Sequence, residues 1–325
     1  MPTPNKPNFF IVGAPKCGTT ALYSYLAGHP EVGMSKNKEP HFFATDVLGD
    51  QRPSPTLSHY LSNFDHAARK KRIGEASTSY LASRIAPEAI LKFSPDAQII
   101  VMVRNPIDAL HAMHSQRLRN GCEHITQFEV AVDSEETRYW QSRPFRGKPV
   151  LNSSYRETIR FVEQIQRYFN VFGRDRVHVI VFDDLASAPR AAYLKVLSFL
   201  GMPDDDRRNF KIVNGNKRIR SQTVQNGLRY LSRKLWRMEQ VLPTWCQEAR
   251  DIAARLNYVH EPRPAMDAAF RQQLEMEYAS ETRDLEVLLQ RSLNHWLTPP
   301  NRSVAKLAPV NFELRKAARA ETQTV

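Results

Sequence analysis

The fold of this chain is decided by the stretch Phe9-Phe10-Ile11-Val12-Gly13-Ala14-Pro15-Lys16-Cys17-Gly18-Thr19-Thr20-Ala21-Leu22. An apolar run typical of a buried strand is followed by a loop between two glycines and then by the first residues of a helix. Backbone N–H groups in such a loop, together with the positive end of the helix dipole, attract an anion. The sequence therefore predicts a phosphate-binding loop at the end of a buried strand.

The loop departs from the pattern that binds nucleoside triphosphates. In G-x-x-x-x-G-K-[ST], a lysine directly after the second glycine reaches the β- and γ-phosphates. Gly13 and Gly18 keep this spacing, but Thr19 stands where that lysine should be, and the lysine of this chain is Lys16, inside the loop. We therefore expect an anion site that lacks the usual arrangement for ATP.

Apolar strands alternate with amphipathic helices along the rest of the chain. Strands are expected at about residues 8–13, at Glu75, at 98–103 and at 177–182, and helices at about 18–28, 87–93, 107–119, 155–172 and 188–200. This alternation predicts an α/β fold with a P-loop-like parallel β-sheet and helices on both faces. We expect a single domain over residues 1–300, with a substrate-facing insertion at 121–151, and a polar, flexible tail over 301–325.

Positive charge is concentrated in the second half of the chain. The formal net charge is +12, and ten Lys or Arg residues and no acidic residue lie between Arg207 and Met238. We expect a basic helical segment at 207–260, with an apolar stripe at helical spacing. It is interpreted either as a solvated surface helix or, over 207–238, as a docking face for an acidic glycan or a membrane surface. The charge implies an anionic partner, but no nucleic-acid motif accompanies it, so we expect no nucleic acid.

Other features narrow the class of protein. The clean apolar runs fall far short of the roughly 18 to 20 residues that a membrane-spanning helix needs. The polar N-terminus does not resemble a signal peptide, so a cytoplasmic location is expected. The cysteines Cys17, Cys122 and Cys246 are too few and too scattered for a disulfide framework or a tetrahedral zinc site.

Further motifs follow the loop in order. They are Glu75-Ala76-Ser77-Thr78-Ser79-Tyr80, Arg104-Asn105-Pro106 after an apolar strand, Val177 to Leu185 with its Phe-Asp-Asp-Leu ending, and Asn294-His295-Trp296-Leu297. Together with the Pro-Lys-x-Gly-Thr-Thr loop, this series resembles the sulfotransferases that use 3′-phosphoadenosine 5′-phosphosulfate (PAPS), in their carbohydrate (heparan-sulfate-type) branch. The resemblance extends over residues 8–297. It implies transfer of a sulfuryl group to a hydroxyl or amine, on a carbohydrate, a glycolipid or a natural-product phenol.

The resemblance implies contacts to the 5′-phosphosulfate end of PAPS. Lys16 would meet the sulfate and the bridging oxygen of the leaving phosphate. Gly18, Thr19 and Thr20 would supply backbone N–H and hydroxyl donors to the 5′-phosphate. Cys17 belongs to the same cofactor-binding loop, and we expect it to be a compact packing residue there and not a nucleophile.

The resemblance also implies contacts to the 3′-phosphate, which the product 3′-phosphoadenosine 5′-phosphate (PAP) retains. Arg104 would clamp this phosphate with its planar guanidinium group, and Lys217 and Arg218 would close over it from a late loop. The family usually has a serine eight residues after the arginine, where this chain has Ala112; Ser115, one helical turn further on, is a candidate substitute. We expect no metal, because a singly charged sulfuryl group needs less neutralisation than a γ-phosphoryl group.

The acceptor needs a general base, for which the resemblance favours Glu75. His41 is the competing base, because another branch of the family uses a histidine; its position in a Glu-Pro-His-Phe-Phe run suggests a residue that lines the substrate. Lys38 is expected to stabilise the sulfate or the acceptor.

Two other classes of function remain as alternatives. A P-loop kinase or NTPase would use Asp183 or Asp184 as a Mg²⁺ ligand, but the missing lysine after Gly18 argues against it. A polyanion-binding module without catalysis, which includes a degenerate sulfotransferase fold, would account for the charge alone.

Overall fold

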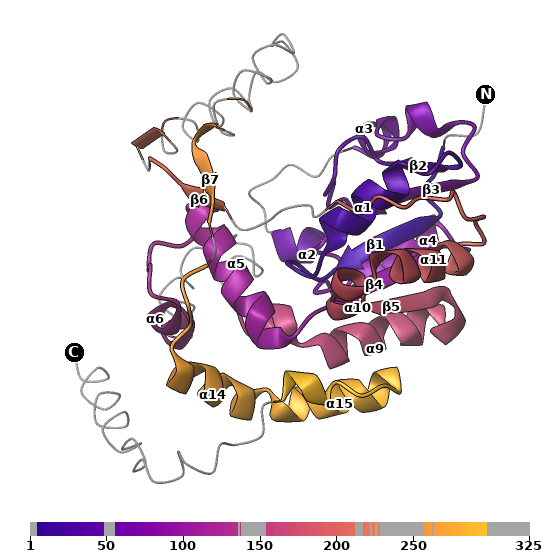
Figure 1. The fold of residues 1–325 in the computed structure, drawn as a ribbon. Coiled ribbons are helices and arrows are strands. Elements are labelled where there is room, and N and C mark those ends of the chain that lie inside the picture. The colour runs from indigo at the N-terminus through magenta and orange to yellow at the C-terminus, as the bar shows by residue number, and fades with distance from the viewer. Residues whose placement is uncertain are drawn as a thin grey trace.

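The computed structural model describes residues 5–48, 56–135, 137, 154–211, 217–221, 223, 224, 227, 252, 256–261 and 263–297. Its centre is a five-stranded sheet in the order β2-β3-β1-β4-β5 (Figure 1), and all neighbouring strands are parallel. The strands are β1 Phe9–Gly13, β2 Val32–Met34, β3 Arg72–Ala76, β4 Gln98–Val103 and β5 Val177–Val181. Because β1 lies between β3 and β4, the segments that follow these strands meet at one edge of the sheet.

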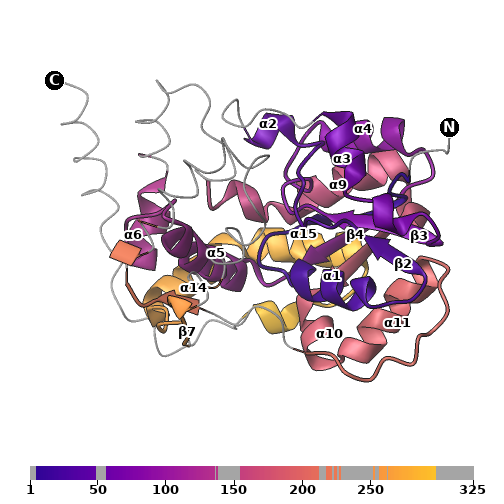
Figure 2. The same cartoon turned by 90° about the horizontal axis from the view of Figure 1, so that it is seen from above.

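Helices cover both faces of this sheet. The longer ones are α1 Thr19–Ala27, α4 Ala86–Phe93, α5 Pro106–Asn120, α9 Phe161–Phe172, α11 Pro189–Phe199, α14 Ala268–Glu277 and α15 Ala279–Leu289. The shorter ones are α2 Thr45–Leu48, α3 Leu57–Ser62, α6 Phe128–Asp133, α10 Phe182–Ser187 and the 3₁₀ helices η1 Asp65–Ala67, η2 Glu157–Ile159, η3 Arg174–Arg176 and η4 Asn294–Trp296. Figure 2 shows α1, α10 and α11 on one face and α4 and α9 on the other. The predicted α/β fold is confirmed.

The central strands form as predicted because their sequences are apolar throughout. Residues Phe9 to Val12 of β1 and Ile99 to Val103 of β4 are completely buried. A strand of a parallel sheet that is covered on both faces reads as a continuous apolar run and not as an alternating one. The hydrophobic core therefore lies on both faces of β1 and β4.

The helix predicted at 155–172 begins later than expected. The chain forms η2 and then α9, and Arg160 between them has φ −74° and ψ 66°. The side-chain amide of Gln164 donates to the carbonyl of Glu157 at 2.7 Å, and the hydroxyl of Thr158 donates to the carbonyl of Ser154 at 2.9 Å. At the break between η2 and α9, these side chains donate in place of backbone N–H groups. The two carbonyls therefore keep a hydrogen-bond partner.

The strand predicted at 177–182 ends at Val181, and the Phe-Asp-Asp-Leu segment is the helix α10. Asp183 and Asp184 lie in its first turn, where the helix dipole favours negative charge. The C-terminal segment fixes both of them: Trp296 Nε1 donates to Asp183 Oδ2 at 2.6 Å, and Arg291 binds both oxygens of Asp184 at 2.6 and 3.1 Å. The Asn294-His295-Trp296-Leu297 motif of the resemblance follows α15 and contains η4.

A second, two-stranded sheet pairs β6 Lys217–Ile219 with β7 Tyr258–His260 in antiparallel register. It lies apart from the main sheet, beside α5 (Figure 1). The helical prediction for 207–260 is therefore wrong at both strands, which contain residues of high β-propensity. Most of the chain between β6 and β7 lies outside the described residues, as does the whole tail 301–325.

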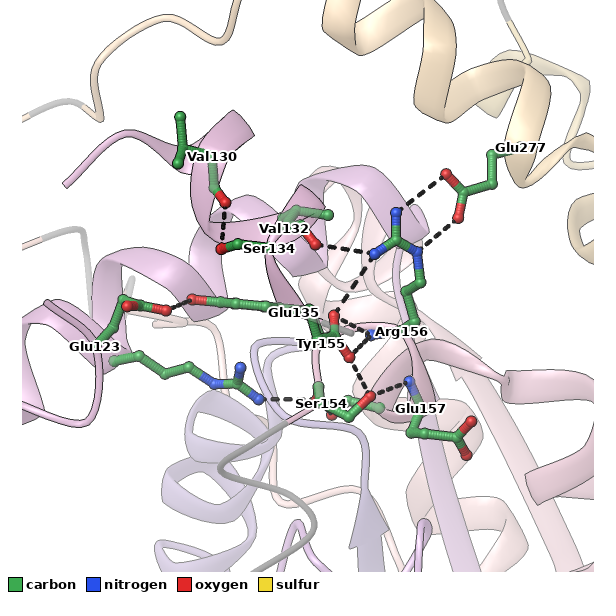
Figure 3. Close-up of polar contacts among 12 residues, drawn as sticks. Glu123, Val130, Val132, Ser134, Glu135, Ser154, Tyr155, Arg156, Glu157 and Glu277 are labelled. Atoms are coloured by element: carbon green, nitrogen blue, oxygen red, sulfur yellow. Dashed lines mark hydrogen bonds and ion pairs between the residues drawn. The ribbon is translucent and has the colours of Figure 1, made fainter. Parts of the chain in front are cut away.

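Polar contacts join Glu135, inside the predicted insertion 121–151, to the residues that follow the insertion (Figure 3). The hydroxyl of Ser154 donates to Glu135, and Arg156 forms ion pairs with Glu135 at 3.8 Å and with Glu277 at 2.8 Å. Apart from residue 137, the chain between Glu135 and Ser154 lies outside the described residues, so its substrate-facing role stays a prediction. No helix in the described part of the chain is both long and apolar enough to cross a bilayer.

The close packing of β3 against β1 gives a first prediction. A Cβ atom added at Gly74 would lie 2.2 Å from Cζ of Phe9, whose ring is completely buried. We expect Gly74→Ala to lower the free energy of unfolding by about 1–3 kcal/mol through overpacking, measured by urea denaturation. Gly28→Ala is the control, because its methyl group would meet only the flexible guanidinium group of Arg207. Equal losses in the two variants would contradict the prediction.

Candidate active site

The loop that is predicted to bind phosphate joins β1 to α1, so the predicted order of strand, loop and helix is confirmed. The backbone N–H of Ala14 donates to the carbonyl of Met102 at 2.6 Å, which ties the loop to β4. Lys16, at φ 64°, and Gly18, at φ 92°, both adopt the left-handed region. Such a conformation is costly for lysine and is found most often at functional sites.

Gly18 is required where the loop enters α1. A Cβ atom at this position would lie 2.9 Å from the ring of Phe182 and would need a positive φ. Because Gly18 has no side chain, the amino end of α1 has no side-chain cap. The backbone N–H groups at the very start of α1, those of Thr19 and Thr20, can therefore bind an anion.

Several cations converge on Lys16. The pKa of Lys16 is lowered to about 8, first by burial and then by the positive charges of Arg119, Arg263 and Arg104. These arginines come from the two ends of α5 and from the connection between β7 and α14. Such a concentration of like charges around a buried lysine is suited to a ligand with several negative charges.

Cys17 is a buried packing residue. Its side chain is fully covered, its Sγ donates to the carbonyl of Pro15 at 3.4 Å, and burial raises the pKa of the thiol to about 12. A thiol that stays protonated is a poor nucleophile, in agreement with the role expected from the sequence.

Arg104 follows β4 at the same edge of the sheet. Its guanidinium group lies over the ring of Phe182, 4.6 Å from the ring centre, and its Nη2 is 3.9 Å from Oδ2 of Asp108. The next residue, Asn105, caps α5 by accepting from the N–H of Ile107 at 3.0 Å. Lys16 and Arg104 thus follow the adjacent strands β1 and β4; that they bind the two ends of one cofactor stays a prediction.

The predicted contacts of Lys217 and Arg218 with the 3′-phosphate cannot be located among the described side chains. The backbone of Lys217 and Arg218 forms β6, and their side chains lie outside the described part of the structure. Ala112 is buried in α5, and the hydroxyl of Ser115 donates to the carbonyl of His111 at 3.2 Å. The hydrogen of Ser115 is therefore used within its own helix and is not directed to a phosphate.

Glu75 is completely buried at the end of β3. Its Oε1 accepts from the hydroxyls of Tyr60 at 3.0 Å and Tyr80 at 2.8 Å, and its Oε2 accepts from Ser77 at 3.2 Å. Burial raises the pKa of Glu75 to about 7, although the three hydroxyls oppose this change. The pKa suits a general base, but the carboxylate has no access to solvent.

A second carboxylate, Glu39, was not predicted from the sequence as a site residue. Its side chain is 38% exposed, and its Oε1 is 2.6 Å from Nζ of Lys38, while its Oε2 is 3.4 Å from Nε2 of His41. Burial acts to raise the pKa of Glu39, but the hydrogen bonds and charges of His41 and Lys38 outweigh it and lower the pKa to about 2. Its place between Lys38 and His41 in the Glu-Pro-His-Phe-Phe run was the signal available in the sequence.

Hydrogen bonds connect Glu39 to Glu75. The backbone N–H of Glu39 donates to the carbonyl of Ala76 at 2.9 Å. The hydroxyl of Ser77, which donates to Glu75, accepts from the backbone N–H of His41 at 3.0 Å. Glu39 and His41 have φ 64° and 56°, so this loop holds two residues in the left-handed region beside the carboxyl end of β3.

Within the described residues, no group of His, Cys, Asp and Glu side chains is arranged to hold a metal ion. The groups gathered at this edge of the sheet are cations, hydroxyls and two carboxylates. Such a set can bind a polyvalent anion and accept a proton beside it.

The burial of Glu75 predicts how stability depends on pH. Because the pKa of Glu75 is about 7 in the folded state and 4.5 ordinarily, the folded protein keeps a proton that the unfolded chain loses in this range. Its stabilising contribution is therefore complete below pH ~4.5 and is lost as the pH rises to ~7. We expect Glu75→Gln to abolish this dependence. The unfolding free energy of wild type relative to Glu75→Gln should therefore fall by on the order of 3 kcal/mol between pH 5 and 8.

Urea unfolding at each pH measures this difference. Glu39→Gln is the control, because the pKa of Glu39 is lowered to about 2 and its contribution is lost only as the pH falls below about 4.5. A wild-type stability that does not fall relative to Glu75→Gln over pH 5–8 would contradict the assignment.

Known proteins with similar sequences and structures are sulfotransferases. The chain is 33% identical over 150 residues to carbohydrate sulfotransferase 15 of Mus musculus, covering 33% of this chain and 26% of that protein. It is 36% identical over 112 residues to heparan sulfate glucosamine 3-O-sulfotransferase 6 of Homo sapiens, covering 34% of this chain and 31% of that protein. The matches thus span a third or less of these relatives.

A solved structure resembles most of the chain. The crystal structure of a sulfotransferase from Alicyclobacillus acidocaldarius matches with a TM-score of 0.67 and 26% identity, over 90% of this chain and 99% of that one. A family model described as the sulfotransferase domain matches residues 6–229, which is more than half of the sequence. This chain therefore belongs to the sulfotransferase domain family.

Proposed function

We propose that this protein transfers the sulfuryl group of PAPS to a hydroxyl or amine of a carbohydrate acceptor. The observation that carries the proposal is the placement of Lys16 and Arg104 at the ends of the adjacent strands β1 and β4. Two cationic sites at this edge suit a ligand with an anionic group at each end of a nucleoside. The names of its relatives, a carbohydrate and a heparan sulfate sulfotransferase, support a carbohydrate acceptor.

In this proposal, the loop between β1 and α1 binds the 5′-phosphosulfate. Gly18, Thr19 and Thr20 donate to the 5′-phosphate at the amino end of α1. Lys16 neutralises the charge that develops on the bridging oxygen as the S–O bond breaks. Arg104 binds the 3′-phosphate. PAPS supplies the sulfuryl group, and PAP is the leaving group.

The two carboxylates, Glu39 and Glu75, have different roles in this proposal. We propose that Glu39, which is 38% exposed, accepts the proton of the acceptor, because the fully buried Glu75 cannot reach an acceptor in solution without rearrangement. The acceptor O–H or N–H bond breaks as its oxygen or nitrogen bonds to sulfur, and the sulfur releases the oxygen of the 5′-phosphate. Glu75 then acts as a positioning residue that holds Ser77, and through it the backbone of His41.

Lys38 tunes the basicity of Glu39 in this scheme. In the structure its ammonium group contacts Oε1 of Glu39 at 2.6 Å and helps to lower the pKa of that carboxyl to about 2. An arriving sulfonate attracts Lys38, which weakens this ion pair. The pKa of Glu39 then rises, and the carboxylate becomes a better base at the moment when the acceptor needs one.

The kinase or NTPase alternative is not favoured. It requires Asp183 or Asp184 as a magnesium ligand, yet Trp296 and His295 contact Oδ2 of Asp183 at 2.6 and 2.8 Å. Arg291 occupies both oxygens of Asp184. A metal ion would have to displace these partners.

The cofactor assignment predicts a pattern of binding. We expect PAP to bind the protein more tightly than ATP with Mg²⁺. We expect Lys16→Ala and Arg104→Ala each to weaken PAP binding by about 1.5–3 kcal/mol, the usual worth of a charged hydrogen bond. Isothermal titration calorimetry measures each affinity. Arg283→Ala, which removes one exposed positive charge on α15, is the control and should leave binding within about twofold. A preference for ATP with Mg²⁺ would overturn the proposal.

The assignment of the base predicts a difference between two variants. Glu39→Gln removes the proton acceptor, and we expect the rate of sulfate transfer to fall by about 10²–10⁴-fold with little change in PAP affinity. Glu75→Gln keeps hydrogen-bonding groups for its neighbours, and we expect a loss of less than about tenfold. The assay follows labelled sulfate from PAPS to uronic acid and glucosamine oligosaccharides, glycolipids and phenols. A greater loss in Glu75→Gln than in Glu39→Gln would return the role of base to Glu75.

A further inference from the structure

The hydroxyl of Ser79 is a buried group of the candidate active site that the proposed mechanism does not use. Ser79 is 3% exposed, and its Oγ lies 2.6 Å from Nδ1 of His41. The other nitrogen of this ring, Nε2, lies 3.4 Å from Oε2 of Glu39. The imidazole ring therefore connects a buried hydroxyl to the carboxylate that is proposed as the base.

The chain on both sides of Ser79 is fixed to the central sheet. The backbone N–H of Ser77 donates to the carbonyl of Ile11 at 3.0 Å, and that of Leu81 donates to the carbonyl of Val12 at 2.7 Å. Both acceptors are completely buried residues of β1. A hydroxyl held in this way can orient a side chain that contacts it, because its own position is set by the sheet.

The partners of His41 fix which ring nitrogen carries a hydrogen. The carboxylate of Glu39 is ionised, since its pKa is lowered to about 2, so it can only accept, and Nε2 must donate to it. When His41 is neutral, Nδ1 is an acceptor and the hydroxyl of Ser79 donates to it. When His41 is protonated, Nδ1 donates and the same hydroxyl accepts. The contact of Nε2 with Glu39 is therefore kept in both forms of the ring.

The two oxygens of Glu39 have partners of different mobility. Oε2 faces the ring of His41, whose backbone N–H is also fixed, because it donates to Oγ of Ser77 at 3.0 Å. Oε1 faces Nζ of Lys38 at 2.6 Å and the hydroxyl of Thr78 at 3.5 Å. The ammonium group of Lys38 ends a flexible chain and can move away, whereas the ring is held on both sides. Oε1 is therefore the oxygen that can become free.

We propose that Ser79 is a positioning residue for the sulfuryl transfer, which fixes the ring of His41 so that Nε2 holds Oε2 of Glu39 and leaves Oε1 to accept the proton of the acceptor. The proposal rests on the proposed function, because it takes Glu39 as the base. Ser79 touches neither substrate nor cofactor in this scheme. It acts through the imidazole, which keeps the carboxylate in one orientation while Lys38 moves to the sulfonate.

Long-range proton–nitrogen NMR spectra of protein with isotope-labelled histidine test the orientation of the ring, because they report which nitrogen of each imidazole carries a hydrogen. The signals of His41 are those that His41→Asn removes. We expect wild type to carry a hydrogen on Nε2 in both the neutral and the protonated ring, and we expect Ser79→Ala to shift the Nδ1 signal of the neutral ring. A neutral wild-type ring with its hydrogen on Nδ1, or an unchanged Nδ1 signal in Ser79→Ala, would overturn the proposal.

Sulfate transfer to the acceptor used for the Glu39→Gln comparison tests the effect on the reaction. We expect Ser79→Ala to lower kcat by about 3- to 10-fold, the usual worth of one hydrogen bond. The KM for the acceptor and the affinity for PAP should change by less than about twofold, because the contact acts on the base and not on binding. In the background of Glu39→Gln, Ser79→Ala should cause no further loss, because the serine acts through the carboxylate.

Ser83→Ala is the matched control. Ser83 is a buried serine of the same segment, but its hydroxyl donates to Asp46 at 2.6 Å and accepts from the backbone N–H of Ala86 at 2.9 Å. We expect its kcat to stay within about twofold of wild type, and thermal unfolding shows whether each variant is folded.

The outcomes separate this proposal from the proposed function. Full transfer by Glu39→Gln would overturn the assignment of the base and the role of Ser79 in the reaction with it. A loss in Glu39→Gln, with an unchanged kcat in Ser79→Ala, would overturn only the role of Ser79. An equal loss in Ser83→Ala, or a further loss when Ser79→Ala is added to Glu39→Gln, would indicate a general effect on the structure and would also contradict the proposal.

Discussion

The position of β1 between β3 and β4 is the constraint on which the rest of the structure depends. In a parallel sheet, the carboxyl ends of neighbouring strands lie at the same edge, so the loops that follow β1, β3 and β4 lie close together there. Backbone hydrogen bonds fix this arrangement: the N–H of Ala14 donates to Met102 of β4 at 2.6 Å, and the N–H of Ser77 donates to Ile11 of β1 at 3.0 Å. The phosphate-binding loop, the Glu75 segment and the Arg104 turn are neighbours for this reason.

Positive charge gathers at the site formed at this edge. Lys16 is close enough to Arg104, Arg119 and Arg263 for their charges to lower its pKa. Like charges that converge in a partly buried place destabilise the unliganded protein, and a polyanion that binds there removes the repulsion. In the proposed function, this gathering of positive charge provides the affinity for a nucleotide with phosphate groups at two positions.

The two carboxylates of the site have opposite environments although hydrogen bonds connect them. Glu75 is buried among hydroxyl groups. Desolvation outweighs the hydrogen bonds from these hydroxyls and raises the pKa of Glu75 to about 7. Glu39 is open to solvent and paired with Lys38 and His41, which lowers its pKa to about 2. The proposed roles, a buried acid that organises a loop and an exposed acid that meets the acceptor, follow from the difference in exposure more directly than from the pKa values.

The sequence by itself determined the sheet, the phosphate-binding loop and the arginine after β4, because these depend on local patterns: continuous apolar strands, glycines that permit the loop, and a proline that begins α5. Local patterns could not determine which distant residues join the site. The burial of Glu75 and the approach of Arg263 to Lys16 arise from packing between segments far apart in the chain. The strands β6 and β7 replaced a predicted helix for the same reason, since each strand is stabilised by a partner about forty residues away. Only the tertiary structure decides such contacts, because burial and charge depend on every segment that packs around a side chain.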